Sequence, residues 1–188
     1  MTAETIRRLT RADVAAFRAL RLEGLQRYPE AFGSSYEEES EYTPADFERF
    51  LPDSPPGGAY GAFVDGALVG IAALVVSPKL KQRHKGHLVA VYLTPAHRRG
   101  GLARRLIEML LQEARTSGLL SVTLTVTAGN EAARRLYLGL GFVPYGLERR
   151  AVCVDGIFHD DELMALELEP VEGIASVVMQ TTRSENEL

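Results

Sequence analysis

Residues 91–106 join an apolar strand to an amphipathic helix through a basic loop with two adjacent glycines. The strand runs to Leu93, the loop holds Gly100 and Gly101, and apolar residues then recur at helical spacing. The first amides of a helix have no partner inside the helix, and the helix dipole favours negative charge there. Because glycine has no Cβ, the backbone can approach a ligand closely. The loop is therefore typical of a phosphate-binding site.

The spacing of the glycines separates this loop from two other phosphate-binding motifs. The dinucleotide fingerprint needs three glycines at another spacing, and a Walker loop needs Gly-Lys followed by Ser or Thr, which this loop lacks. The structural alternative is an ordinary strand–turn–helix in which Gly100 and Gly101 only form the turn. The loop alone leaves that alternative open.

A second motif lies at residues 130–142, with the sequence NEAARRLYLGLGF. Asn130 can cap a helix, Tyr137 lies on its apolar face, and Gly141 can end it in the left-handed conformation. A tyrosine phenol has an ordinary pKa of about 10, close to the value of about 8.5 for a thiol, so Tyr137 can donate a proton to a thiolate. Its structural alternative is a core aromatic whose hydroxyl binds a backbone carbonyl.

Together the two motifs resemble those of the GNAT acetyltransferase superfamily. Arg98-x-x-Gly101-x-Ala103 is similar to the pyrophosphate motif R/Q-x-x-G-x-G/A, with Ala103 where glycine is usual, and residues 130–142 resemble N-x-x-A-x-x-L-Y-x-x-x-G-F. The resemblance implies acetyl-CoA as co-substrate, with no metal. The residues that it implies in cofactor binding are Val91, Tyr92, Leu93, Arg98, Arg99, Gly100, Gly101, Leu102, Ala103, Arg104, Asn130 and Tyr137.

The resemblance also implies the fold, and the order of the predicted elements agrees with it. The pattern predicts a strand, two helices, a hairpin, a strand–helix–strand core, a helix and closing strands that include residues 142–145 and 149–154. The expected class is α/β, as a mixed α+β GNAT-type fold whose central mixed sheet of about seven strands is flanked by about four helices. In this family the strands that hold Val91 and Leu124 splay apart, and the pantetheine arm enters the gap.

The composition limits which kinds of protein and which partners remain possible. A chain of 188 residues with 46% hydrophobic residues suits one domain, expected over residues 1–170, with 171–188 as an extension that is partly ordered at best. A net charge of −4 argues against a nucleic-acid partner, no apolar stretch is long enough for a membrane, and the histidines lack metal-ligand spacing. We expect a cytoplasmic protein with a buried Cys153, and family members suggest a homodimer to which residues 174–179 contribute.

Acetyl transfer to an amine needs a group that takes a proton from the ammonium before the attack. Glu38 and Glu39 lie in a polar, acidic stretch that the resemblance places over the acceptor site, and Glu39 is a candidate base. His87, at the start of the central strand, is the other candidate, with His84 and Tyr92 nearby. The alternatives are a solvated acidic loop for the glutamates and a backbone-bonded strand-end histidine for His87.

The function predicted from these motifs is acetyl transfer from acetyl-CoA to a primary amine by direct attack, with Tyr137 as the catalytic acid. A small-molecule amine is the preferred acceptor, and the acidic stretch favours a cationic one. Two alternatives stay open. One is acetylation of the α-amino group of a protein, such as a ribosomal protein; the other is a non-catalytic, acyl-CoA-binding regulatory module. An intact phosphate loop together with Tyr137 favours an enzyme.

Overall fold

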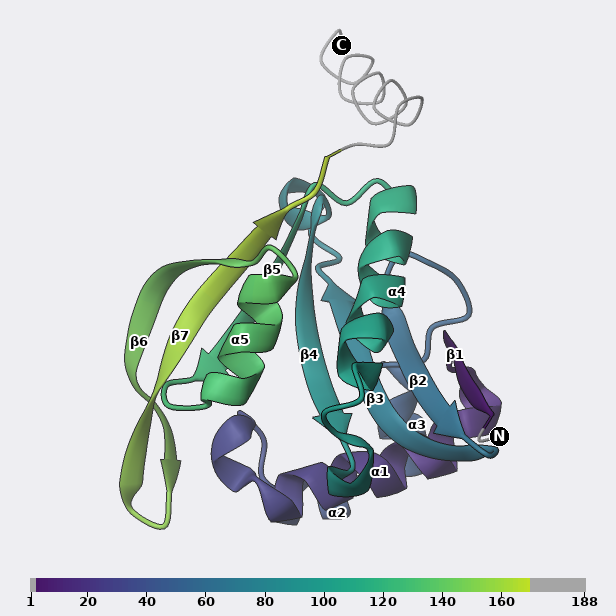
Figure 1. Cartoon of the computed structure of the whole chain (residues 1–188), viewed down its shortest axis with the longest axis horizontal. Helices are drawn as coiled ribbons and strands as arrows, with labels where there is room; N and C mark the ends of the chain where they lie inside the picture. The colour runs from purple at the N-terminus through teal and green to yellow at the C-terminus, as the bar shows by residue number, and fades with distance from the viewer. Residues whose placement is uncertain (1–2, 170–188) are drawn as a thin grey trace, which may run out of the picture.

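The computed structural model describes residues 3–169 of the chain, which form one seven-stranded sheet with five α-helices around it (Figure 1). The strands are β1 (Glu4–Arg8), β2 (Gly58–Val64), β3 (Ala67–Val76), β4 (Lys85–Leu93), β5 (Ser121–Thr127), β6 (Val143–Val154) and β7 (Ile157–Glu167). The helices are α1 (Val14–Arg27), α2 (Tyr36–Ser40), α3 (Pro44–Glu48), α4 (Leu102–Thr116) and α5 (Glu131–Gly139). The predicted mixed α/β fold is confirmed.

The strands lie in the order β1-β2-β3-β4-β5-β7-β6, and only the pair β4 and β5 is parallel. Helices α4 and α5 cover one face of the sheet, and α1 and α3 cover the other (Figure 1). Leu106 and Ile107 of α4 are fully buried on the first face, and Phe17 and Phe47 on the second. Each such side chain contributes about 1.5–3 kcal/mol through burial. The two cores hold β4 and β5 in the middle of the molecule.

The parallel pairing of β4 with β5 is short. It covers Lys85 to His87 on β4 and Ser121 to Thr123 on β5, although both strands continue beyond this register. Further along β4, Ala90 has a φ of +53°, a left-handed conformation that a non-glycine residue seldom adopts, and the register between β3 and β4 shifts opposite it. The two central strands therefore part after His87, which confirms the splay that the resemblance predicted.

The acidic stretch before α3 is not simply a loop. Ser35 and Glu38 form a capping box, in which the Glu38 amide donates to Ser35 Oγ at 3.1 Å and the Ser35 amide donates to Glu38 Oε2 at 3.0 Å. This box starts the short helix α2. The helix turns Glu39 toward the protein, where its side chain is only 1% exposed, so the solvated-loop alternative is wrong for Glu39.

The C-terminal part of the sheet corrects two further predictions. β6 is one strand where two were expected, because irregular pairing with β7 between Glu148 and Val152 takes the place of a break. Cys153 is exposed, so its expected burial is wrong: β6 is an edge strand, and an apolar run there does not have to face a core. The extension 171–188, with the expected dimer contact at 174–179, lies outside the described residues.

Candidate active site

The glycine loop ends on the N-terminus of α4. Gly101 is the N-cap of this helix with a φ of +78°, so the position favours glycine on backbone grounds. No side chain caps the helix, which leaves the amides of Leu102, Ala103 and Arg104 without an intrahelical partner. A Cβ built on Gly100 or Gly101 meets nothing within 4 Å, so open space faces the loop at both positions. The loop therefore leaves its unpaired amides beside open space, into which a side chain at Gly100 or Gly101 would project.

Three arginines in and after the loop contact neighbouring parts of the protein. Arg98 Nε donates to the Leu93 carbonyl at 2.9 Å, and its guanidinium donates to the Tyr28 hydroxyl at 2.9 Å while it stacks on that ring. Arg104 donates to the Gly139 carbonyl at 2.7 Å and so ties α4 to α5. Arg105 pairs with Glu4 of β1. The motif arginine therefore positions the loop against the end of β4, a role that its spacing alone does not reveal.

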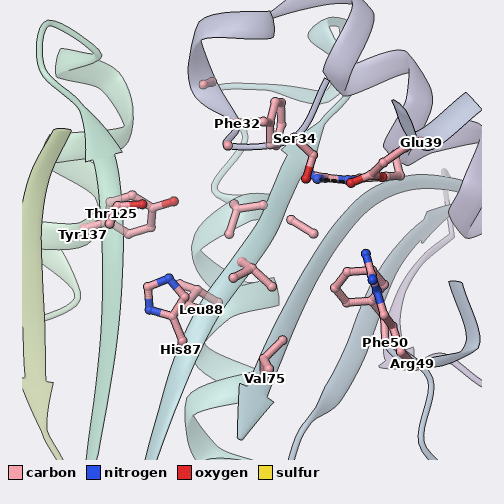
Figure 2. Close-up of a pocket in the computed structure, with 16 residues that line it drawn as sticks. Phe32, Ser34, Glu39, Arg49, Phe50, Val75, His87, Leu88, Thr125 and Tyr137 are labelled. Carbon is pink, nitrogen blue, oxygen red and sulfur yellow. Dashed lines mark hydrogen bonds and ion pairs between the residues drawn. The ribbon is translucent and has the colours of Figure 1, made fainter. Parts of the chain in front are cut away.

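A cavity of about 580 Å³ opens where β4 and β5 part (Figure 2). Its walls come from β3, β4, β5, α1, α5 and the segments around α2 and α3. The polar or aromatic residues that line it are Arg21, Phe32, Ser34, Glu39, Arg49, Phe50, His87, Thr125 and Tyr137. Of the predicted site residues, Glu39, His87, Val91 and Tyr137 meet here. The three catalytic candidates, Glu39, His87 and Tyr137, therefore line one cavity at the point where β4 and β5 part.

Tyr137 reaches the cavity from α5, where Asn130 caps the helix as predicted by accepting from the Ala133 amide at 3.2 Å. The Tyr137 ring packs edge-on against Phe142, and burial raises the pKa of its phenol. Within residues 3–169 no protein group hydrogen-bonds the Tyr137 hydroxyl, in contrast to the backbone-bonded core tyrosine considered above. A protonated hydroxyl that lines the cavity in this way can donate to a ligand.

Glu39 lies in the cavity wall as half of a buried ion pair. Its carboxylate accepts from Arg21 Nη2 at 2.7 Å and from Arg21 Nε at 3.0 Å, and the two side chains are 1% and 7% exposed. Protonating Glu39 would leave the buried Arg21 cation without its counter-charge, which is costly. This arrangement argues against Glu39 as the base and for a role in holding α2 on α1. Arg21 and Glu39 are 18 residues apart, and no local pattern pairs them.

His87 is half-buried, and its Nδ1 lies 3.0 Å from Thr123 Oγ1 on β5. Burial lowers the pKa of the imidazole below its ordinary value of 6.5. The other base candidates lie outside the cavity lining. Tyr92 donates to Glu23 at 3.0 Å, and burial with this hydrogen bond raises its pKa to about 12. His84 is exposed, and Glu38 is engaged in the capping box.

Sequence reasoning missed Arg21, Phe32, Arg49 and Thr125, because distant segments bring them to the cavity. Thr125 alone carried a usable pattern, since Thr123 and Thr125 alternate with buried residues along β5 and so share its other face. Residues 3–169 hold no cluster of three or more His, Cys, Asp or Glu side chains suited to a metal ion. Within the same residues, none of the helices has both the length and the apolar character that crossing a membrane requires.

Comparison with known proteins agrees with this geometry. The model of the acetyltransferase (GNAT) family matches residues 22–142. The N-alpha-acetyltransferase RimI of Mycobacterium tuberculosis is 36% identical over 163 residues, which cover 83% of this chain and 91% of that protein.

Two solved structures show the same fold. A GNAT-family acetyltransferase from Streptococcus pneumoniae is 27% identical with a TM-score of 0.79, covering 88% of this chain and 100% of its own. The structure of yncA from Salmonella typhimurium with its cofactor acetyl-CoA is 22% identical with a TM-score of 0.74, covering 91% and 97%. The chain belongs to the GNAT family and is an acetyltransferase that uses acetyl-CoA.

Proposed function

We propose that this enzyme transfers the acetyl group of acetyl-CoA to the α-amino group at the N-terminus of a polypeptide. One observation carries the choice of acceptor: the relative named as an N-alpha-acetyltransferase is 36% identical over 91% of its own length. This proposal reverses the order of acceptors predicted from the sequence, where a small-molecule amine came first. The small amine remains the competing outcome of the test below.

The loop at the start of α4 supplies the donor site. The amides of Gly101, Leu102, Ala103 and Arg104 point to the unpaired end of the helix, where the dipole favours the negative charge of a diphosphate. Gly100 leaves room for the same group. Main-chain groups of β4 beyond the split, around Val91, then face the part of the ligand that leads to the thioester. The bound thioester supplies an activated acetyl carbon.

Tyr137 supplies the proton for the leaving thiolate. Burial raises the pKa of the phenol, so the hydroxyl stays protonated at neutral pH. A thiolate has an ordinary conjugate pKa of about 8.5 and gains the proton as the carbon–sulfur bond breaks. The hydroxyl lies at the cavity on the α5 side, and the acceptor enters from the α1 and α2 side. The Tyr137 hydroxyl and the acceptor amine therefore approach the thioester from opposite walls of the cavity.

A second hollow supports an extended acceptor. It has a volume of about 700 Å³ and shares Phe32, Gly33 and Ser34 with the cavity, so the two hollows meet at this segment. Its far wall is the end of β6, from Ala151 to Val154, with Asp155 of the turn that follows. Together the hollows provide room for residues that follow the acetylated one. Glu37, Glu38 and Asp155 line the second hollow and none of its described lining residues is basic, which favours a basic residue at an early position of the polypeptide.

The test is a panel of short peptides with free N-termini, covering each N-terminal residue and either lysine or glutamate at the following positions. Alanine amide and spermidine serve as small amines, and an N-acetylated peptide is the blocked control. Thiol release gives the rate, and mass spectrometry gives the modified nitrogen.

We expect α-amine acetylation, with kcat/KM for lysine-bearing peptides at least about tenfold above the glutamate-bearing ones and above alanine amide. In the variant E37Q/D155N this preference for lysine should shrink. Turnover on small amines alone, with every peptide inert, would refute the polypeptide acceptor.

A further inference from the structure

We propose that His87 removes the proton from the ammonium group of the acceptor, and that Thr123 holds the His87 ring in the tautomer which this step requires. The role rests on the proposed acetyl transfer to an amine, but it does not depend on which amine is used. His87 stands at the last paired position of β4, immediately before the strands part, and its side chain lines the cavity (Figure 2). The proposed base therefore lies at the split between β4 and β5, where the acetyl-CoA thioester is proposed to bind.

The contacts of Thr123 provide for the tautomer that leaves Nε2 free. Thr123 Oγ1 donates its single proton to the Gly86 carbonyl at 3.4 Å. With that proton on the carbonyl, a lone pair of Thr123 Oγ1 is free for His87 Nδ1, which lies 3.0 Å away, and in this proposal Nδ1 carries the ring proton. In neutral imidazole only one ring nitrogen carries a proton, so Nε2 keeps a free lone pair. Figure 2 shows the His87 ring between β4 and β5, on the side of the cavity that also holds Thr125 and Tyr137.

The other titratable groups that face the cavity are engaged in other roles. Glu39 is fully paired with Arg21, and the raised pKa of Tyr137 keeps its phenol protonated, so it has no proton-accepting oxyanion near neutral pH. Arg49 is a cation that stacks on Phe50 at 4.9 Å. Among the described lining residues, His87 is the remaining side chain that can accept a proton near neutral pH.

The surroundings of His87 favour its neutral, basic form. Arg21 and Arg49 bring two positive charges to the cavity wall and Glu39 brings one negative charge, while Val75 of β3 and Thr123 of β5 flank His87 without charge. Burial is what lowers the pKa of the ring below 6.5. At pH 7 the imidazole is therefore neutral, with Nε2 ready to accept a proton. An α-amino group has an ordinary pKa of about 7.7–8.0, above that of the buried ring, so the proton transfer to His87 runs uphill.

The protons and bonds of the reaction then balance. His87 Nε2, directly or through one water, takes one proton from the ammonium and leaves a neutral amine. The amine nitrogen attacks the acetyl carbon, a carbon–nitrogen bond forms, and the carbon–sulfur bond breaks. Tyr137 gives its proton to the thiolate and regains one from the acylated nitrogen. The net products are the amide, the free thiol and one proton, which His87 releases to solvent.

The test compares the wild-type enzyme with H87Q and with H84Q as a matched control, since His84 is exposed and does not line the cavity. The acceptor is the best peptide of the panel above, and kcat/KM is measured between about pH 6 and pH 9.5, which brackets the ordinary pKa of an α-amine. At pH 7 we expect H87Q to lose about 10²-fold in kcat/KM. The loss should shrink to a few-fold at about pH 9.5, where the amine is already neutral. H84Q should match the wild-type enzyme throughout.

Thr123 acts through His87 and is a positioning residue, so its variants need the same readout. T123V should lose about tenfold in kcat/KM at pH 7 and regain it at high pH, whereas T123S keeps the hydroxyl and should stay near wild type. The dissociation constant for acetyl-CoA, from calorimetric titration, should stay the same in all four variants.

Either of two results would overturn the assignment of His87: full activity of H87Q at pH 7, or a loss that is the same at every pH. The proposed acceptor fails separately, when the wild-type enzyme acetylates alanine amide or spermidine but no peptide. In that case the comparison of H87Q with wild type is made on the small amine. An enzyme that acetylates none of these amines contradicts both proposals.

Discussion

Replacing Glu39 with glutamine should destabilise the fold far more than it slows acetyl transfer. The substitution keeps the shape of the side chain but removes the charge that balances Arg21. Both side chains are almost fully buried, at 1% and 7% exposure, and two hydrogen bonds of 2.7 and 3.0 Å join them. Arg21 also lies over the Phe32 ring at 4.7 Å, so it has little freedom to turn toward solvent.

The expected cost follows from this burial. Removing one partner of a buried pair costs about 3–5 kcal/mol, because the other charge stays buried without compensation. For a domain of this size each 1 kcal/mol shifts Tm by about 2–4 °C, so E39Q should melt about 6–20 °C lower. The double variant R21M/E39L removes both charges and should recover most of this loss. Urea denaturation at 25 °C and thermal melting measure the two effects.

The same variant separates a structural role from a catalytic one. If Glu39 only holds α2 against α1, folded E39Q well below its Tm should keep kcat within a few-fold of wild type. A general base contributes at least about 10²-fold. A fall in kcat of that size with an unchanged Tm would therefore refute the structural assignment and return Glu39 to the list of bases.

Two further variants test the donor side. G101E places a Cβ and a carboxylate in the phosphate cradle, at a residue with a φ of +78°. Two unit charges about 5 Å apart repel by about 3 kcal/mol at an effective dielectric constant of 20, so titration calorimetry should show at least about 10²-fold weaker acetyl-CoA binding, while unchanged affinity would contradict the loop assignment. Y137F should lower kcat by about 10²-fold with little change in acetyl-CoA affinity; an unaffected rate would leave Tyr137 with a packing role only.

The sequence predicted those parts of the fold that local patterns determine. The glycine loop, the amphipathic α4 and the Asn130 cap each depend on residues within one or two turns of each other, and all three are present. The capping box of α2 was also readable, as Ser35 followed three residues later by Glu38, but the density of charge around it favoured a loop.

The candidate site required contacts that no local pattern contains. Arg21 and Glu39 come from different helices, and His87 meets Thr123 across two strands that are joined through α4. The predicted burial of Cys153 failed for a similar reason: an apolar run does not show whether its strand lies at the centre or the edge of a sheet. The roles of individual side chains therefore became visible only with the tertiary structure.

A crystal structure of the enzyme with acetyl-CoA tests most directly where the donor binds. We expect the diphosphate oxygens within hydrogen-bond distance, about 2.7–3.2 Å, of the amides from Gly101 to Arg104. The thioester should lie between the parted ends of β4 and β5, with its sulfur facing the Tyr137 hydroxyl. A ligand that left these amides unbound, or a sulfur atom on the far side of β4 from Tyr137, would contradict the account.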